Sequence, residues 1–303
     1  MPEGHTVHRV AKLFDALFVG RTMEASSPQG RFGQGAANIS GRTIVAVEAV
    51  GKQLFIDLDN DLVLRVHLGI YGAWDVATHP DNSEIAQVLT SLGAPRSRAR
   101  RFGESEGDRD APDLFPPLPI GQVRLRLVTD DVVADLRGPT ACEVITREAA
   151  DAVRDRLGPD PLVTKGTRGQ KVFTQRLLAT KRPIGLVLMD QSVVAGIGNV
   201  YRAEILFRHR LDPYRPASSH SAELAAALWK DWGVLLRDGI ATGVMLTRDD
   251  LSPSEKKKAL RSPQNRHWVY KREGQECRVC GSVVAMDVMA ARKLYFCPSC
   301  QAS

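Results

Sequence analysis

The spacing of apolar residues changes several times along the chain. Val7, Val10 and Phe14 recur every three or four positions, which predicts a helix that begins just after Pro2. Residues 171–243 show the same period and predict a second, longer helical region. Between these two regions lie segments in which apolar and polar residues alternate.

Alternation with a period of two predicts β structure over residues 42–72 and again over residues 122–136. In the first segment, Asp59-Asn60-Asp61 is a turn candidate between two strands. The resulting hairpin places Arg65 and His67 on one face, opposite its apolar face.

Several segments interrupt these patterns. Residues 103–119 are acidic and proline-rich and predict a surface loop, whereas residues 148–157 predict a helix that stops at a Gly-Pro pair. Residues 195–199 form a glycine-rich turn between helical segments, and residues 244–266 predict a mobile basic loop.

Composition excludes several classes of protein. Hydrophobic residues make up 43% and charged residues 25% of the 303 positions, which excludes a globally disordered chain. At roughly 100–200 residues per domain, the length predicts two or three domains. No apolar run approaches the ~18 residues that span a bilayer, and the N-terminus lacks a secretory signal pattern. We therefore expect a cytoplasmic protein that is not secreted and has no membrane partner.

The net charge of +6 is unevenly distributed. Residues 1–200 carry 24 basic and 24 acidic side chains, whereas residues 201–303 carry 17 and 11. Between Glu255 and Arg272, seven basic residues accompany one acid. A basic patch on a neutral body fits a polyanionic partner such as nucleic acid, and it equally fits a solvated charged loop.

Four of the five cysteines cluster near the C-terminus, as Cys277-x2-Cys280 and Cys297-x2-Cys300. Two such pairs separated by 16 residues match a four-thiolate zinc site with a β-hairpin between the pairs. Because all four ligands come from the protein, one structural Zn²⁺ is expected. Cys142 stands alone and is expected to be a buried structural residue. A zinc ribbon by itself does not identify an enzyme.

The chain begins Met1-Pro2-Glu3, and removal of Met1 before the small Pro2 would leave a free secondary amine. An α-amino group has a pKa near 8, so roughly a tenth of it is unprotonated at pH 7 and can attack a carbonyl carbon. The resulting iminium ion is an electron sink, and Glu3 could transfer protons beside it. Taken alone, the motif is weak, because Glu3 could simply favour the start of the following helix.

Three motifs in order along the chain resemble one family. The N-terminal Pro-Glu-Gly, the segment 190–213 and the zinc motif are similar to those of the formamidopyrimidine-DNA glycosylase and endonuclease VIII family of base-excision repair enzymes. The resemblance runs nearly end to end and is weakest over residues 75–120. It assigns further positions by motif: the hairpin lysine to Lys52, the helix-two-turn-helix to residues 190–201 with Asn199 on a phosphate, and the zinc-finger arginine to Arg292.

The resemblance implies an α+β fold with two main domains. The first would be an N-terminal β-sandwich flanked by helices, and the second a helix-two-turn-helix domain with a β-hairpin zinc finger. The implied boundaries are a catalytic domain over 1–145, a linker over 146–170, the helical DNA-binding domain over 171–265 and the zinc finger over 266–303.

The resemblance also implies a mechanism. Pro2 attacks the sugar of an everted damaged nucleotide, the base leaves, and β- and δ-elimination cut the strand. Glu3 assists ring opening, and Lys52, Asn199 and Arg292 hold phosphates around the reacting nucleotide. His67 is a further candidate phosphate contact.

Lesion preference depends on the side chains that fill the space left by the everted base. Ile70 and Tyr71 are the candidates here, and they resemble the endonuclease VIII branch more than the methionine of formamidopyrimidine glycosylases. The motif Arg-Arg-Phe-Gly at residues 100–103 precedes the 121–136 strand and is therefore a decoy. The loop in the family position begins at Arg137, a candidate DNA contact, and carries Pro139 in place of phenylalanine. We therefore expect oxidised pyrimidines as preferred substrates.

The expected partner is damaged double-stranded DNA, with single-stranded DNA as a second candidate, bound by a monomer. Two other functions stay open at this point. One is a formamidopyrimidine or 8-oxoguanine glycosylase of the same family. The other is a noncatalytic DNA-binding protein with a zinc ribbon.

Overall fold

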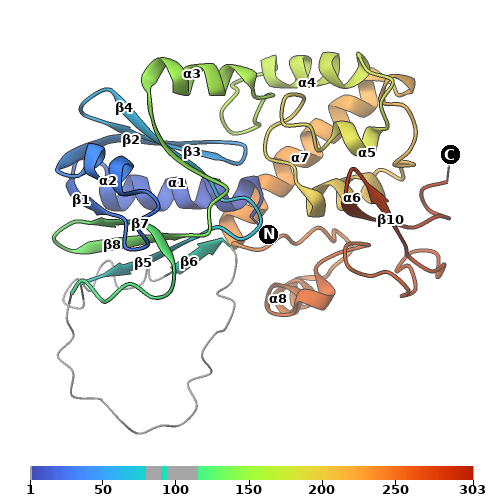
Figure 1. The fold of residues 1–303 in the computed structure, drawn as a ribbon. Coiled ribbons are helices and arrows are strands. Elements are labelled where there is room, and N and C mark those ends of the chain that lie inside the picture. Colours follow the sequence, from blue (N-terminus) through green and yellow to red (C-terminus); the bar gives the residue numbers. More distant parts are fainter. Residues whose placement is uncertain (1, 80–89, 94–114, 303) are drawn as a thin grey trace, which may run out of the picture. The chain divides into compact units, whose positions relative to one another are not determined.

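A computed structural model describes residues 2–79, 90–93 and 115–302 (Figure 1). Contacts group the chain into two compact units, each considered by itself below. The first comprises Met1–Pro2 with Thr6–Arg154, and the second comprises Glu3–His5 with Asp155–Ser303. The decoy motif at residues 100–103 and most of the expected loop over 103–119 lie outside the described residues.

The first unit is built on antiparallel strands. One group has the order β2-β3-β4-β9 and the other β1-β7-β8-β5-β6, and a short pairing of β1 with β2 at Thr22 and Thr43 joins the groups. The strands are β1 (Thr22–Ser26), β2 (Arg42–Val50), β3 (Gln53–Leu58), β4 (Leu62–His67), β5 (Ala73–Thr78), β6 (Thr90–Gly93), β7 (Val123–Val128), β8 (Val132–Arg137) and β9 (Ala141–Thr146). Alternation over 42–72 and 122–136 therefore predicted strands correctly.

Helix α1 (Gly4–Phe18) confirms the helix expected after Pro2, and in Figure 1 it lies between the two groups of strands. Its apolar side chains share one buried core with both groups. Phe14 packs against Phe18 and Trp74 with ring centroids 4.9 and 4.8 Å apart. Two further helices, α2 (Gly33–Ile39) and α3 (Arg147–Arg156), lie among the described residues of this part of the chain.

The second unit is mainly helical, as predicted for residues 171–243. It contains α4 (Arg168–Leu178), α5 (Ile184–Val187), α6 (Asn199–Arg208), the 3-10 helix η2 (Ala217–Ser219) and α7 (Ala222–Thr242). Helix α6 is buried from Asn199 to Phe207, and Tyr201 packs against Trp232 of α7 at 4.8 Å. The zinc-finger hairpin follows as β10 (Ala285–Met289) and β11 (Arg292–Phe296). No helix within the described residues is long and apolar enough to span a membrane.

The expectation of a mobile loop over 244–266 is wrong. The segment contains α8 (Pro253–Arg261) and the 3-10 helix η3 (Pro263–Asn265). Helix α8 begins with a capping box, in which Ser252 and Glu255 satisfy each other's backbone N–H groups, and it has proline at its first position. The motif Ser-x-x-Glu at residues 252–255 indicates this helix start, but the three lysines that follow it favoured the interpretation as a loop.

Candidate functional site

The Glu3 carboxylate binds the N-terminus of α6. It accepts hydrogen bonds from the backbone N–H groups of Gly198 at 2.9 Å, Val200 at 2.8 Å and Tyr201 at 3.3 Å, and it is fully buried. The N-cap residue Gly198 has no side chain to satisfy these groups, so a carboxylate from the other end of the sequence does so. Negative charge is also favourable at this end of a helix.

The glycine-rich turn before α6 allows this close approach. A Cβ on Gly198 would lie 2.4 Å from Cδ of Glu3, and a Cβ on Gly4 would lie 2.9 Å from Cα of Gly196. The Gly4 N–H donates to the carbonyl of Gly196 at 3.0 Å. The N-terminal segment therefore packs against this turn. The peptide bond between Pro2 and Glu3 keeps Pro2 next to the anchored Glu3.

Asn199, the first residue of α6, connects the helix to the zinc-finger hairpin. Its Nδ2 donates to the carbonyl of Lys293 at 2.8 Å. Arg202, one turn along α6, donates to Oδ1 of Asn199 and, at 3.2 Å, to the same carbonyl. Burial, together with the nearby positive charge of Arg292, lowers the pKa of Arg202 to about 10. The structure therefore brings Asn199 beside the segment that carries Arg292.

Arg292 lies at the tip of the hairpin and is exposed. It pairs with Met289 across the two strands, and the turn between them consists of Ala290 and Ala291. Both alanines have positive φ, 50° and 58°, a conformation that costs a non-glycine residue roughly 1 kcal/mol. The turn holds the start of β11 in place and directs Arg292 toward solvent.

Two functional candidates in this unit escaped sequence reasoning, Glu204 and Tyr270. The Glu204 carboxylate, fully buried on α6, accepts hydrogen bonds from the backbone N–H groups of Trp268 (2.7 Å), Val269 (2.9 Å) and Tyr270 (2.8 Å). Burial and the negative charge of Glu3 raise the pKa of Tyr270 to about 12, and a hydrogen bond with Asn199 acts in the opposite direction. Helix α6 therefore holds Asn199 and Tyr270 together.

The four clustered cysteines form a metal site. The Sγ atoms of Cys277, Cys280, Cys297 and Cys300 all lie within 4.8 Å of one another, with individual separations of 3.5 and 3.9 Å. A tetrahedral zinc with Zn–S bonds of about 2.3 Å places its sulfur atoms about 3.8 Å apart, so the site fits Zn²⁺. Since all four ligands are thiolates, the zinc is structural and confirms the prediction.

In the first unit, Lys52 occupies the two-residue turn between β2 and β3, where Gly51 has a φ of 58°. His67 ends β4 and pairs with Gln53 of β3. Burial lowers the pKa of His67, and the charges of Lys52 and Arg65 lower it further. In the free protein the neutral imidazole of His67 is therefore favoured near pH 7, and a neutral imidazole can still donate a hydrogen bond to a phosphate.

The loop between β4 and β5 presents Ile70 and Tyr71, which are 47% and 77% exposed. It packs against the loop between β8 and β9: a Cβ on Gly69 would lie 1.8 Å from Oγ1 of Thr140, and one on Gly138 would lie 3.2 Å from the carbonyl oxygen of Tyr71. Large exposed apolar side chains on a supported loop suit insertion between bases.

Arg137, at the end of β8, is paired with Asp75 of β5. Its role as a DNA contact stays a prediction, and the structure adds that the guanidinium already has a carboxylate partner. Cys142 lies in β9 and is half-buried rather than fully buried as expected, and desolvation raises the pKa of its thiol to about 12. His5 is buried and packs edge-on against Tyr201, with ring centroids 5.6 Å apart.

The predicted site residues therefore fall into two groups. Glu3, Asn199 and Arg292 gather around α6 in the second unit. Five others belong to the first unit, at the turn and strand ends just described: Lys52, His67, Ile70, Tyr71 and Arg137. Pro2 groups with the first unit, although its neighbour Glu3 binds within the second.

Comparison with known proteins covers most of the chain. Family models match for the formamidopyrimidine-DNA glycosylase N-terminal domain over residues 1–104 and its H2TH domain over residues 157–250. A third model, the zinc finger found in FPG and IleRS, matches residues 274–302.

Relatives of the same length are found. The chain is 38% identical to Endonuclease 8 1 of Mycobacterium tuberculosis, over 99% of this chain and all of the relative. It is 31% identical to a formamidopyrimidine-DNA glycosylase of Thermus thermophilus, over 99% and 98% of the two chains.

Solved structures share the fold. The crystal structure of the MutM (Fpg) protein from Thermus thermophilus superposes with a TM-score of 0.69 at 25% identity, over 100% of this chain and 99% of that one. A Lactococcus lactis Fpg bound to DNA containing an AP site gives a TM-score of 0.70 at 21% identity, over the whole of both chains.

Proposed function

This chain belongs to the formamidopyrimidine-DNA glycosylase and endonuclease VIII family, whose members are DNA glycosylases with AP lyase activity, and we propose that it excises oxidised bases through a Schiff base on Pro2. The α+β fold and the zinc site are those expected of the family. The observation that carries the proposal is the binding of Glu3 by the N-terminus of α6, because it fixes the residue bonded to the reacting amine.

The reaction begins once Met1 is removed and the damaged nucleotide is everted. The unprotonated Pro2 nitrogen attacks C1′ of the sugar, the N-glycosyl bond breaks and the base leaves with a proton. Opening of the sugar ring then yields an iminium ion between Pro2 and C1′. Because this cation withdraws electrons, a proton leaves C2′ and the 3′ phosphate is eliminated, and a second elimination releases the 5′ phosphate. Hydrolysis of the imine restores the amine.

Glu3 has two tasks in this scheme. Its three backbone hydrogen bonds position the N-terminal segment. We also assign to its carboxylate the proton transfer that accompanies ring opening, because a carboxylate is a suitable general acid and base. Glu3 is thus both the residue that orients the nucleophile and the proposed proton carrier.

Several individual side chains hold the DNA in this proposal. Lys52, Asn199 and Arg292 bind phosphates next to the everted nucleotide, and His67 donates a further hydrogen bond. These contacts orient the strand without reading its sequence. Ile70 and Tyr71 fill the gap in the base stack. The preferred substrates are oxidised pyrimidines, a preference supported by these two side chains and by Pro139 in the neighbouring loop.

A panel of duplexes, each with one lesion, tests the preference. Faster excision of oxidised pyrimidines than of 8-oxoguanine opposite cytosine is expected, with a 3′ phosphate and a 5′ phosphate left on the strand. Excision confined to 8-oxoguanine opposite cytosine would establish the alternative, an 8-oxoguanine specialist. Binding without cleavage of any lesion or abasic site would establish a noncatalytic DNA-binding protein. The same panel in single-stranded form, with the mass of the protein in solution, tests the predictions of single-strand activity and a monomer.

A further inference from the structure

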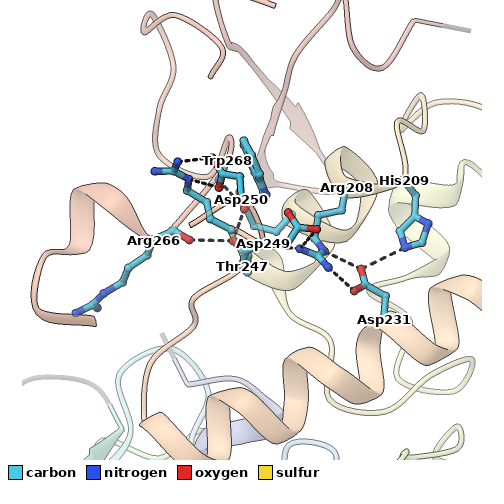
Figure 2. A network of polar contacts seen from close by, with 10 residues as sticks. Arg208, His209, Asp231, Thr247, Asp249, Asp250, Arg266 and Trp268 are labelled. Atoms are coloured by element: carbon cyan, nitrogen blue, oxygen red, sulfur yellow. Dashed lines mark hydrogen bonds and ion pairs between the residues drawn. The ribbon is translucent and has the colours of Figure 1, made fainter. Parts of the chain in front are cut away.

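The basic segment between α7 and the zinc finger forms a loop, residues 247–266, whose two ends lie together; we call this loop the excursion. The N–H of Thr247 donates to the carbonyl of Arg266 at 3.0 Å, and the Thr247 hydroxyl oxygen lies 3.1 Å from the same carbonyl oxygen, so the chain leaves and returns at one point (Figure 2). Helix α8 lies inside this excursion. Its position therefore depends on how firmly the two ends are held.

The Thr247 end is tied to α6 and α7 through Glu204, which is fully buried, and through Arg208 and Asp231, which are half-buried. Thr247 donates through Oγ1 to Glu204, and its carbonyl accepts from Arg208 at 2.7 Å. Arg208 also forms a two-point pair with Asp231 of α7, at 2.7 and 2.9 Å, and an ion pair with Asp249 at 3.0 Å (Figure 2). Paired guanidinium–carboxylate contacts of this kind hold a fixed geometry.

The helix itself is stabilised at both ends. The capping box of Ser252 and Glu255 begins it, and the Arg266 side chain donates to the carbonyls of Ala259 at 3.1 Å and Leu260 at 2.9 Å near its end. Arg278 of the zinc finger donates to the carbonyl of Gln264 at 2.9 Å. Helices this short are marginal in isolation, and the like charges of Lys257 and Arg261, four residues apart, make this one less stable still, so these contacts maintain it.

The charges on the excursion are unbalanced. Its acids are engaged: Asp249 with Arg208, Asp250 with Arg248, and Glu255 in the capping box. Four cations on α8 are exposed and form no hydrogen bond or ion pair with any residue that the structure describes: Lys256, Lys257, Lys258 and Arg261. At 1.5 Å per residue they span about 7.5 Å along the helix axis.

We propose that α8 is a clamp for the sugar–phosphate backbone of duplex DNA. Lys257, Lys258 and Arg261 lie within one face of the helix and can contact phosphates, while none of the exposed side chains of the helix is large and apolar, since Leu260 is half-buried. The clamp rests on the proposed function. It adds affinity for undamaged as well as damaged duplex, and it gives that affinity part of its salt dependence.

The test compares two triple variants. The first is Lys256→Gln, Lys257→Gln and Lys258→Gln, because glutamine retains helix propensity and removes charge. The matched control is Lys165→Gln, Arg168→Gln and Lys171→Gln, three exposed cations at and before the start of α4, a helix well separated from α8 within the second unit (Figure 1). Dissociation constants for an undamaged duplex are measured between about 50 and 200 mM salt.

Each phosphate contact contributes about 0.9 to the slope of log affinity against log salt, so the α8 variant should lose about 2 to 3 from that slope. The control should keep the wild-type slope. An unchanged slope in the α8 variant, or an equal loss in the control, would overturn the clamp. Far-ultraviolet circular dichroism confirms that both variants are folded.

Borohydride trapping on abasic DNA separates this proposal from the proposed function. With enzyme well above the dissociation constant, wild-type protein and both variants should form the covalent adduct. Adduct formation with an unchanged salt slope refutes the clamp alone. Absence of an adduct with the wild-type protein refutes the proposed reaction, whatever the slopes are.

Discussion

Replacing Gly198 by alanine tests how the catalytic end of the chain is held. The substitution leaves Pro2 and Glu3 chemically intact. The backbone at Gly198 has φ −116° and ψ −160°, which alanine adopts without strain. The new Cβ would nevertheless lie 2.4 Å from Cδ and 2.6 Å from Oε1 of Glu3, so the carboxylate must move.

The size of the effect follows from these contacts. Restoring an ordinary contact moves the carboxylate by about 1 Å, which stretches its 2.9 and 2.8 Å hydrogen bonds with the N–H groups of Gly198 and Val200 beyond hydrogen-bonding distance. Each hydrogen bond to a charged group contributes about 1.5–3 kcal/mol, so holding the N-terminal segment in place becomes about 3–6 kcal/mol less favourable. A shift of about 1 Å at a reacting group lowers a rate by about 100-fold.

Single-turnover excision of an oxidised pyrimidine measures this loss, and amide hydrogen exchange at Val200 measures the broken hydrogen bond. We expect a roughly 100-fold slower excision together with faster exchange at Val200. The control is Gly33→Ala in α2, where a Cβ meets nothing within 4 Å, and it should behave as wild type. Wild-type excision by Gly198→Ala would show that the α6 N-terminus does not position the nucleophile.

Three further predictions concern the zinc site, the buried Glu204 of α6, and His67 at the end of β4. Cys297→Ser should release zinc and weaken DNA binding, which metal analysis and a DNA-binding assay check. Retention of the zinc and of the affinity for DNA would contradict a structural role of the zinc. Glu204→Gln should leave at least one backbone N–H of residues 268–270 without an acceptor and cost about 2–3 kcal/mol, which thermal unfolding checks. A wild-type melting temperature would refute this role. Because the folded pKa of His67 is lowered, the unfolded chain binds its proton more readily, so stability falls as pH drops below about 6.5. His67→Gln should weaken that pH dependence, and an unchanged profile would exclude His67 as its source.

Much of the fold was readable from local patterns. Helix α1, the strands over 42–72 and the zinc ligands follow from side-chain period and cysteine spacing, which are properties of neighbouring residues. The capping box of α8 was equally local, but three consecutive lysines suggested a solvated loop. Helix capping at both ends outweighs that charge repulsion.

The missed residues depend on partners remote in sequence. Glu204, in a run of apolar residues on α6, has its acceptor role only because residues 268–270 fold onto it. The sequence alone likewise does not distinguish Arg202 from an exposed helical arginine, because its hydrogen bond to the carbonyl of Lys293 joins residues remote in sequence. Glu3 was predicted as a proton carrier, but its three bonds to the start of α6 could not be foreseen, because no spacing rule joins residue 3 to residue 198.

The central claim is that the amine of Pro2 is the nucleophile, and covalent trapping tests it most directly. Wild-type protein shown by mass spectrometry to lack Met1 is reacted with abasic-site DNA in the presence of borohydride, digested, and the modified peptide is sequenced. The account predicts that DNA is attached to Pro2 and that Pro2→Gly loses most base excision. Attachment to any other residue, or excision unchanged in Pro2→Gly, would contradict it.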